Sequence, residues 1–223
     1  MPLRHKIVIH TVGFIVVALG LSLIICSQLG AAPLDAMNYF LHILISKSIP
    51  QITLGTVVIF TGIAATLFAF ALNREKDMFI SLIFIFVVGL FIDGWMFLLN
   101  LLPTTFLEHL ATRISFAAIG LIISSMGVAL TILTGLPASP YERIMLIIYA
   151  KTNNMVLSKL IIELTFLTAA IILGLITTRL FEQVYLFTII MTFTLGALIS
   201  YFTKIFKKTI VKGVLNNETQ PND

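Results

Sequence analysis

Long stretches that carry no charge constrain this chain more than any other feature of its sequence. The first runs from Ile7 to Leu29. Similar stretches of about 20 residues, the length that spans a bilayer core as a helix, recur along the chain. Hydrophobic residues make up 59% of the sequence and charged residues 11%, with a mean hydropathy of +1.08, whereas a soluble domain carries about 25% charged residues. Because the alternating pattern of β-barrel strands is also absent, we predict an all-α polytopic membrane protein.

The apolar stretches differ in length, and the difference predicts two kinds of helix. Six stretches are long enough to cross the membrane: Ile7–Leu29, Gln51–Leu72, Met78–Leu102, Thr112–Leu136, Met155–Thr177 and Glu182–Phe206. Two others, residues 34–47 and 141–151, are too short to cross a core of ~30 Å at a rise of ~1.5 Å per residue. We predict that these two are re-entrant half-helices.

The distribution of Lys and Arg predicts cytoplasmic N and C termini. With six crossings, the connection at residues 73–77 (NREKD) and the basic residues after 203 fall on the same side as Arg4 and Lys6. The basic residues left outside are Lys47, Arg113 and Arg179. We expect residues 211–223, which end in a polar run, to form a disordered cytoplasmic tail.

The sequence matches itself at an ungapped offset of 107 residues, which indicates an internal duplication. The matched positions include glycine, proline and acidic residues: Gly13 with Gly120, Gly20 with Gly127, Pro33 with Pro140, Asp35 with Glu142 and Gly89 with Gly196. Each copy contains three crossings, so the second copy must be inverted. We expect two inverted three-helix repeats, residues 1–107 and 108–210, which is an architecture of transporters with the site near the repeat interface.

Each short helix is predicted to start with a proline and an acidic residue. Pro33 suits the first helical position, and Asp35 then lies near the positive end of the helix dipole. In the second copy, Ser139 and Glu142 fit a capping box around Pro140. The two acids either only cap their helices or also contact a substrate in a cavity between them, and the sequence leaves both interpretations open.

Asp93 lies well inside the third predicted membrane helix, where a charge is costly and usually faces a cavity or a partner. Asp35, Asn38 and His42 share one face of the first short helix at helical spacing. We predict that these four residues form an outer polar cluster for substrate or proton binding. The alternative is a hydrogen-bonded packing network without a ligand.

Glu163 is the comparable residue of the second half and lies one turn after Lys159. Together with Glu142 and Arg143 it is predicted to form an inner cluster that binds substrate or protons. The alternative is an ion pair of Glu163 with Lys159 that reaches the cytoplasmic surface.

The sequence lacks the common signatures of catalytic, phosphate-binding and metal sites. We therefore expect no enzymatic activity, no cofactor and no metal. Cys26 is the sole cysteine, so an internal disulfide is excluded. The formal net charge of +4 comes mostly from residues at segment ends and does not indicate a nucleic-acid partner.

The segments LGAAPLDAM, GLFIDGW and GLPASPYERIM resemble the YczE/YyaS/YitT group of bacterial membrane proteins over most of the chain. The shared pattern is Gly-x-x-Pro-x-Asp at the start of a short helix, here Gly30, Pro33 and Asp35. In the second half, Glu142 replaces the usual Asp, and a glycine-rich stretch of many relatives is missing around residues 172–187. The resemblance implies a polytopic protein of the bacterial cytoplasmic membrane whose biochemical activity is largely unassigned.

The leading functional hypothesis is a permease-like transporter of a small molecule or ion. The alternative is a membrane subunit that binds or regulates within a larger complex, and an intramembrane enzyme would need a nucleophile or metal cluster that the sequence lacks. The expected partners are the lipid bilayer and a small substrate, and the sequence leaves open a homodimer or a partner membrane protein.

Overall fold

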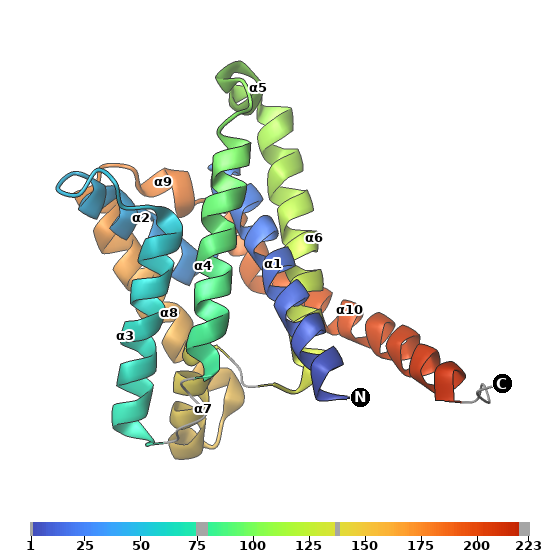
Figure 1. The fold of residues 1–223 in the computed structure, drawn as a ribbon. Helices are drawn as coiled ribbons and strands as arrows, with labels where there is room; N and C mark the ends of the chain where they lie inside the picture. Colours follow the sequence, from blue (N-terminus) through green and yellow to red (C-terminus); the bar gives the residue numbers. More distant parts are fainter. Residues whose placement is uncertain (1, 75–79, 137–138, 219–223) are drawn as a thin grey trace.

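The computed structural model describes residues 2–74, 80–136 and 139–218, and all regular elements in these ranges are helices. They are α1 (Leu3–Ser27), α2 (Pro33–Ser46), α3 (Leu54–Leu72), α4 (Ile80–Leu99), α5 (Thr104–Glu108), α6 (Leu110–Thr134), α7 (Pro140–Thr152), α8 (Met155–Ile176), α9 (Leu180–Gln183) and α10 (Leu186–Glu218) (Figure 1). Six helices are long and apolar enough to cross a membrane. The predicted fold class, an all-α membrane protein with six such helices, is confirmed.

Two elements differ from the predicted boundaries by more than a few residues. The short helix α5 occupies the connection between α4 and α6, where no helix was expected. The predicted helix Glu182–Phe206 consists instead of α9 and α10, and α10 continues to Glu218. Residues 211–218 of the expected disordered tail are therefore helical, because no proline interrupts the backbone ladder after residue 186. Residues 219–223 of that tail and residues 75–77 of the NREKD connection lie outside the described residues.

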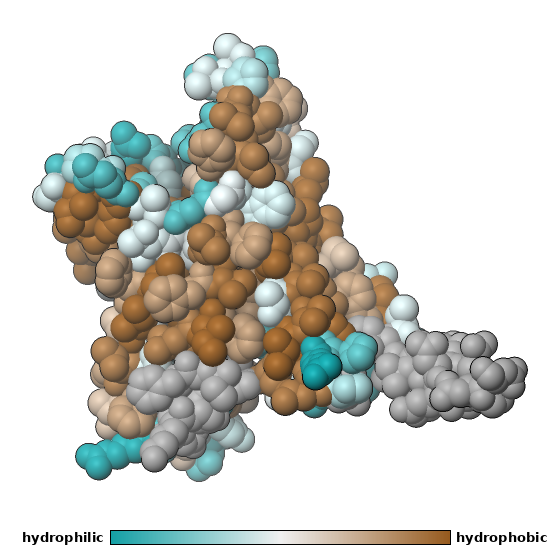
Figure 2. All heavy atoms as spheres, viewed as in Figure 1, coloured by the Kyte–Doolittle hydropathy of each residue, from teal (hydrophilic) through white to brown (hydrophobic). Residues whose placement is uncertain are grey.

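The surface of the molecule matches a membrane-embedded bundle. Apolar side chains cover the middle of the visible face, and polar side chains gather toward its two ends (Figure 2). Large apolar residues such as Phe60, Leu90 and Phe193 are more than half exposed along the long helices. In lipid these side chains face hydrocarbon, so their exposure carries no desolvation penalty.

The first break between helices follows from local backbone chemistry. Gln28 ends α1 in the left-handed conformation with a φ of 50°, and the hydroxyl of Ser27 accepts a hydrogen bond from the Leu29 N–H at 3.3 Å. Gly30 has a φ of 121°, which an L side chain rarely adopts. Pro33 then starts α2, where its missing N–H leaves no bond unmade.

The second break repeats the first in its geometry. Gly135 ends α6 in the left-handed conformation, and the hydroxyl of Thr134 accepts from the Leu136 N–H at 3.2 Å. Pro140 then starts α7. Each of these residues lies 107 positions after its counterpart in the first break.

α1 and α6 cross at two pairs of glycines. A Cβ on Gly20 would lie 2.7 Å from the carbonyl oxygen of Gly120, and a Cβ on Gly120 would lie 2.7 Å from that of Gly20. Gly13 and Gly127 form the second pair. A Cβ on Gly127 would lie 2.7 Å from the carbonyl oxygen of Gly13, and a Cβ on Gly13 would lie 3.0 Å from that of Gly127. The pairing of Gly13 with Gly127 and of Gly20 with Gly120 shows that the two helices are antiparallel. At both pairs the helix backbones are in contact.

The other helices pack around this crossing. α1 packs against α4 and α6 packs against α10, while α2 packs against α8 and α3 packs against α7. A shift of 107 residues converts the α1–α4 contact into the α6–α10 contact. The same shift relates the α2–α8 contact to the α7–α3 contact. The correspondence is incomplete, because α3 also packs along α4, whereas α8 and α10 make no contact of comparable extent in the described ranges.

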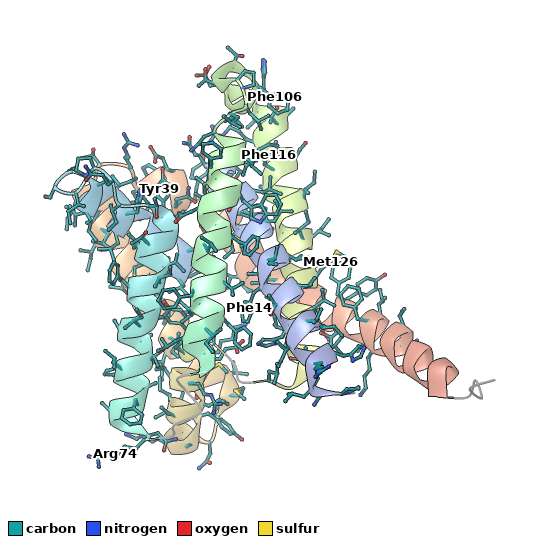
Figure 3. The ribbon with its side chains drawn as sticks, in the orientation of Figure 1. Phe14, Tyr39, Arg74, Phe106, Phe116 and Met126 are labelled. Carbon is teal, nitrogen blue, oxygen red and sulfur yellow. The ribbon has the colours of Figure 1, made fainter. Side chains whose placement is uncertain are left out.

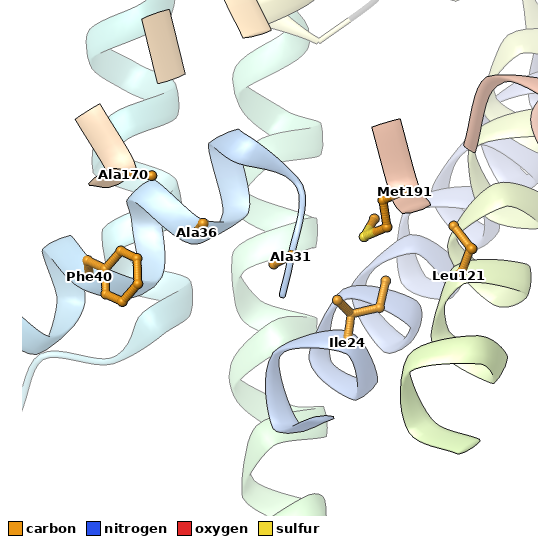
Figure 4. Close-up of a cluster of buried hydrophobic side chains, with 7 residues drawn as sticks. All are labelled: Ile24, Ala31, Ala36, Phe40, Leu121, Ala170 and Met191. Carbon is orange, nitrogen blue, oxygen red and sulfur yellow. The ribbon is translucent and has the colours of Figure 1, made fainter. Parts of the chain in front are cut away.

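A buried apolar cluster joins the first break to the second half of the chain. Ala36 and Phe40 of α2 meet Ala170 of α8, and Ala31 continues the cluster toward α1 (Figure 4). On the other side of Ala31 lie Ile24, Leu121 and Met191. The cluster fixes the start of α2 inside the bundle, against helices from the other half.

The glycine crossing predicts a difference between two alanine substitutions. Gly20→Ala places a methyl group 2.5 Å from the backbone nitrogen of Ser124, which forces α1 and α6 apart and should lower stability by about 1–3 kcal/mol. Gly94→Ala is the matched control, because a Cβ on Gly94 meets nothing within 4 Å. The midpoint of thermal unfolding in detergent measures both variants. Equal midpoints for the two would contradict a close α1–α6 contact.

Candidate functional site

Residues from the starts of both short helices line one cavity of ≈ 400 Å³. α2 contributes Leu34, Asp35 and Asn38, and α7 with its cap contributes Ser139, Tyr141 and Glu142. Apolar side chains of α1, α3, α4, α6 and α10 form most of the remaining wall, among them Leu21, Val58, Ile92, Val128 and Met191. The polar groups in this cavity therefore come mainly from the two short helices.

Phe14 forms part of the wall between α1 and α4. It projects from α1 toward α4 (Figure 3) and stacks on Phe84 with 5.3 Å between the ring centroids. His10 also lines the cavity and packs edge-on against both rings.

The start of α7 is a complete capping box. The Ser139 hydroxyl accepts from the Glu142 N–H at 3.4 Å, and the Glu142 carboxylate accepts from the Ser139 N–H at 3.3 Å. The predicted capping box is therefore present, and Glu142 stabilises the helix start while it also lines the cavity.

The start of α2 lacks this device. Its N-cap residue is Ala32, which has no side-chain oxygen to bind the first N–H groups. Among the hydrogen bonds of the described residues, none involves the Asp35 side chain, although it is half-buried and lines the cavity. Asp35 thus presents a carboxylate that the local helix cap does not use.

Asp35 also lies near a second negative charge. Burial raises the pKa of Asp35 to about 7, from an ordinary value near 4. The negative charge of Glu163 on α8 adds to the effect of burial, because neighbouring carboxylates resist being ionised together. A proton or a cation in the cavity would relieve this repulsion.

A chain of hydrogen bonds joins the two short helices through α3. The Tyr141 hydroxyl of α7 donates to the Thr61 hydroxyl oxygen at 3.2 Å. The Thr61 hydroxyl lies 2.9 Å from Asn38 Oδ1 of α2 and donates to it. Asn38 is buried, so this chain links the two helices away from bulk water.

His10 carries a buried polar atom without a partner. Its ring is 2% exposed, and Nδ1 lies 2.8 Å from the Thr134 hydroxyl. That hydroxyl donates to the Thr131 carbonyl, so we assign the proton of the neutral ring to Nδ1. Nε2 is then a hydrogen-bond acceptor with no donor among the described residues.

Comparison with known proteins places the chain in a family. A sequence model described as "Family of unknown function (DUF6198)" matches residues 4–204. The chain belongs to this family. It is 30% identical over 168 residues to "Uncharacterized protein YyaS" of Bacillus subtilis (strain 168), which covers 75% of this chain and 80% of the relative.

A second relative extends the comparison. The chain is 31% identical over 162 residues to "Uncharacterized membrane protein YczE" of the same organism, which covers 71% of this chain and 70% of the relative. The resemblance to the YczE/YyaS group is confirmed. No solved structure matches the chain.

Within this DUF6198 protein, Asp93 and His42 serve the connection between α2 and α3. The Asp93 carboxylate accepts from the Thr53 hydroxyl at 2.6 Å and from the Gly55 N–H at 2.7 Å. His42 Nε2 lies 3.2 Å from the Ile52 carbonyl oxygen. Neither residue is among those that line the cavity. The structure thus holds Asp93 at the first turn of α3, apart from the cavity that Asp35 and Asn38 line.

Glu163 of α8 lies close enough to Asp35 to act on it electrostatically, but it is not among the residues that line the cavity. Lys159, one turn earlier, is close enough to act electrostatically on both Glu163 and Glu142. Asp35 lies near Glu163, a residue of the expected inner cluster, and near Tyr141, which neither predicted cluster included. Asp35 lies near Glu163 because α2 packs on α8. The sequence of α2 does not specify which helix it packs against.

The predicted site lacked three residues of this region: His10 and Tyr141, which line the cavity, and Thr61, which hydrogen-bonds to Tyr141 and Asn38. His10 could have been found, because it shares a helix face with Gly13, Val17 and Gly20 at spacings of three and four residues. Thr61 and Tyr141 carry no such signal, since they become neighbours only through the α3–α7 contact.

The environment of Asp35 predicts a carboxyl group that titrates near neutral pH. Its pKa of about 7 means that the group is protonated below pH 7 and ionised above it. Infrared difference spectroscopy across a pH titration in lipid should show a protonated-carboxyl band with a midpoint near 7 that disappears in Asp35→Asn. A band that persists unchanged in this variant, or a loss confined to pH 4, would contradict the assignment.

Proposed function

We propose that this protein is a small-solute transporter of the cytoplasmic membrane, built as two inverted three-helix repeats with α2 and α7 as re-entrant half-helices. The observation that carries the proposal is the Asp35 carboxylate, which has no hydrogen-bond partner among the described residues and opens onto a cavity shared by the starts of both short helices. A residue kept only to start α2 would be bound by the N–H groups of that start, as Glu142 is in α7.

The pattern of helix contacts supports the inverted repeat. Exchange of residues i and i+107 maps the α1–α6 glycine crossing onto itself and the α2–α8 contact onto α7–α3. Two inverted halves around a central site can rock to open the cavity to either side in turn. The packing of α10 on α8 is weaker than the matching packing of α4 on α3. This difference between the two repeats would allow one half to move relative to the other.

The topology that we propose places both termini in the cytoplasm. The start of α1 and the end of α10 lie at the lower end of the view (Figure 1). Arg4, Lys6 and the lysines of α10 lie toward that end, which the positive-inside rule assigns to the cytoplasm. The cavity would then be reached from the cytoplasm past α7 and from outside past α2.

Contacts of α9 with α2 form a latch on the outer side. The Tyr39 hydroxyl of α2 donates to the Glu182 carboxylate at 2.7 Å, and Arg179 lies 3.7 Å from the same carboxylate. Arg179 and Glu182 are partly exposed, with side-chain exposures of 54% and 28%. Exchange of these contacts for water therefore costs little, as expected for a contact that opens and closes.

Cysteine accessibility tests the transport cycle without knowledge of the substrate. In a Cys26→Ser background, Leu34→Cys and Ser139→Cys each place a thiol on the cavity. A membrane-impermeant thiol reagent should label both variants from either side, in intact cells and in inverted vesicles. Glu108→Cys, at an exposed position of α5, is the control and should react from one side only.

Labelling of each cavity cysteine from a single side under all conditions would contradict transport. That result would favour the alternative, a membrane subunit that binds a ligand without a cycle of its own.

A further inference from the structure

We propose that the cavity binds a small apolar ammonium ion, with the ammonium group at Asp35. This inference deepens the proposed function and rests on it for the role of the cavity in transport. It follows from the charge of the lining, from its apolar walls, and from the Asp35 carboxylate, which accepts no hydrogen bond among those of the described residues.

The charge of the lining favours a cation. Among the described residues that line the cavity, Asp35 and Glu142 are acidic and none is Lys or Arg. Lys159 offsets part of the charge of Glu142, while the charge near Asp35 is that of Glu163, another carboxylate. The negative charge at Asp35 is therefore uncompensated by any basic residue that lines the cavity.

The helix starts do not reverse this preference. Free N–H groups at a helix start favour an anion. In α7, however, the Ser139 hydroxyl binds the Glu142 N–H and the Glu142 carboxylate lies at the same positive end, and in α2 the Asp35 carboxylate lies in the first turn. An anionic ligand would have to lie against both carboxylates.

The walls favour a ligand with an apolar body. Most of the lining is aliphatic or aromatic, with Phe14, Val58 and Ile92 on one side and Val128 and Leu195 on the other. A volume of ≈ 400 Å³ lies near the lower end of the ~300–1,000 Å³ range of small-molecule pockets. A bare inorganic cation would leave these walls unused, whereas an arylalkyl ammonium would fill them.

Tyramine is a suitable probe, because it combines an ammonium group with an aromatic ring that matches the apolar walls. The protein in lipid nanodiscs should bind radiolabelled tyramine saturably. The neutral alcohol 4-(2-hydroxyethyl)phenol and the anion 3-(4-hydroxyphenyl)propionate, which match its shape, should compete at least about tenfold more weakly. Equal competition by the alcohol or the anion, or no saturable tyramine binding, would overturn the proposal.

Two variants test the contact. Asp35→Asn should weaken tyramine binding about tenfold or more, since it removes a charge-assisted bond. Glu108→Gln is the control and should bind tyramine like the unaltered protein. Unchanged binding by Asp35→Asn, or an equal loss in Glu108→Gln, overturns the cation site.

Uptake of the same amine into proteoliposomes separates this inference from the proposed function. Saturable binding without uptake supports the ammonium site and contradicts transport. Two-sided labelling of the cavity cysteines without tyramine binding supports transport and contradicts the ammonium site.

Discussion

The backbone contact between α1 and α6 is the constraint on which the rest of the structure depends. Two glycine pairs bring these antiparallel helices together, and both helices then end in a left-handed residue. Because the crossing is antiparallel, the two ends lie on opposite sides, and α2 and α7 start from opposite ends of the same seam. The α2–α8 and α3–α7 contacts turn both short helices inward. A shared cavity between their starts follows from this arrangement.

The two acidic residues at these starts have different environments although they occupy matching positions. Glu142 binds the backbone of its own N-cap, whereas Asp35 follows an alanine that cannot cap and lies near Glu163. A structural role accounts for Glu142 without a ligand. For Asp35 the cost of an unbound, half-buried carboxylate remains, and a proton or an ammonium group in the cavity offsets it.

Much of the fold could be predicted from sequence, because the bilayer fixes helix length and because Pro33, Pro140 and the capping box mark helix starts locally. The candidate site was less predictable. The sequence places Asp93 and Asp35 at comparable depth, but Thr53 and the α3 backbone bind Asp93, and α8 brings Glu163 to Asp35. Such pairings depend on which helices pack together, and a single sequence does not encode that choice in any local pattern.

The unfolding stability of two alanine variants tests the central claim, that Asp35 is held for a ligand and Glu142 for its helix. Glu142→Ala removes half of the capping box and should lower the free energy of unfolding by about 0.5–1.5 kcal/mol, the net contribution of one hydrogen bond. Asp35→Ala removes an unbound carboxylate and should leave that free energy unchanged or raise it. Denaturant unfolding in the same detergent measures both. A loss for Asp35→Ala as large as that for Glu142→Ala would show that Asp35 is a structural cap and would contradict the account.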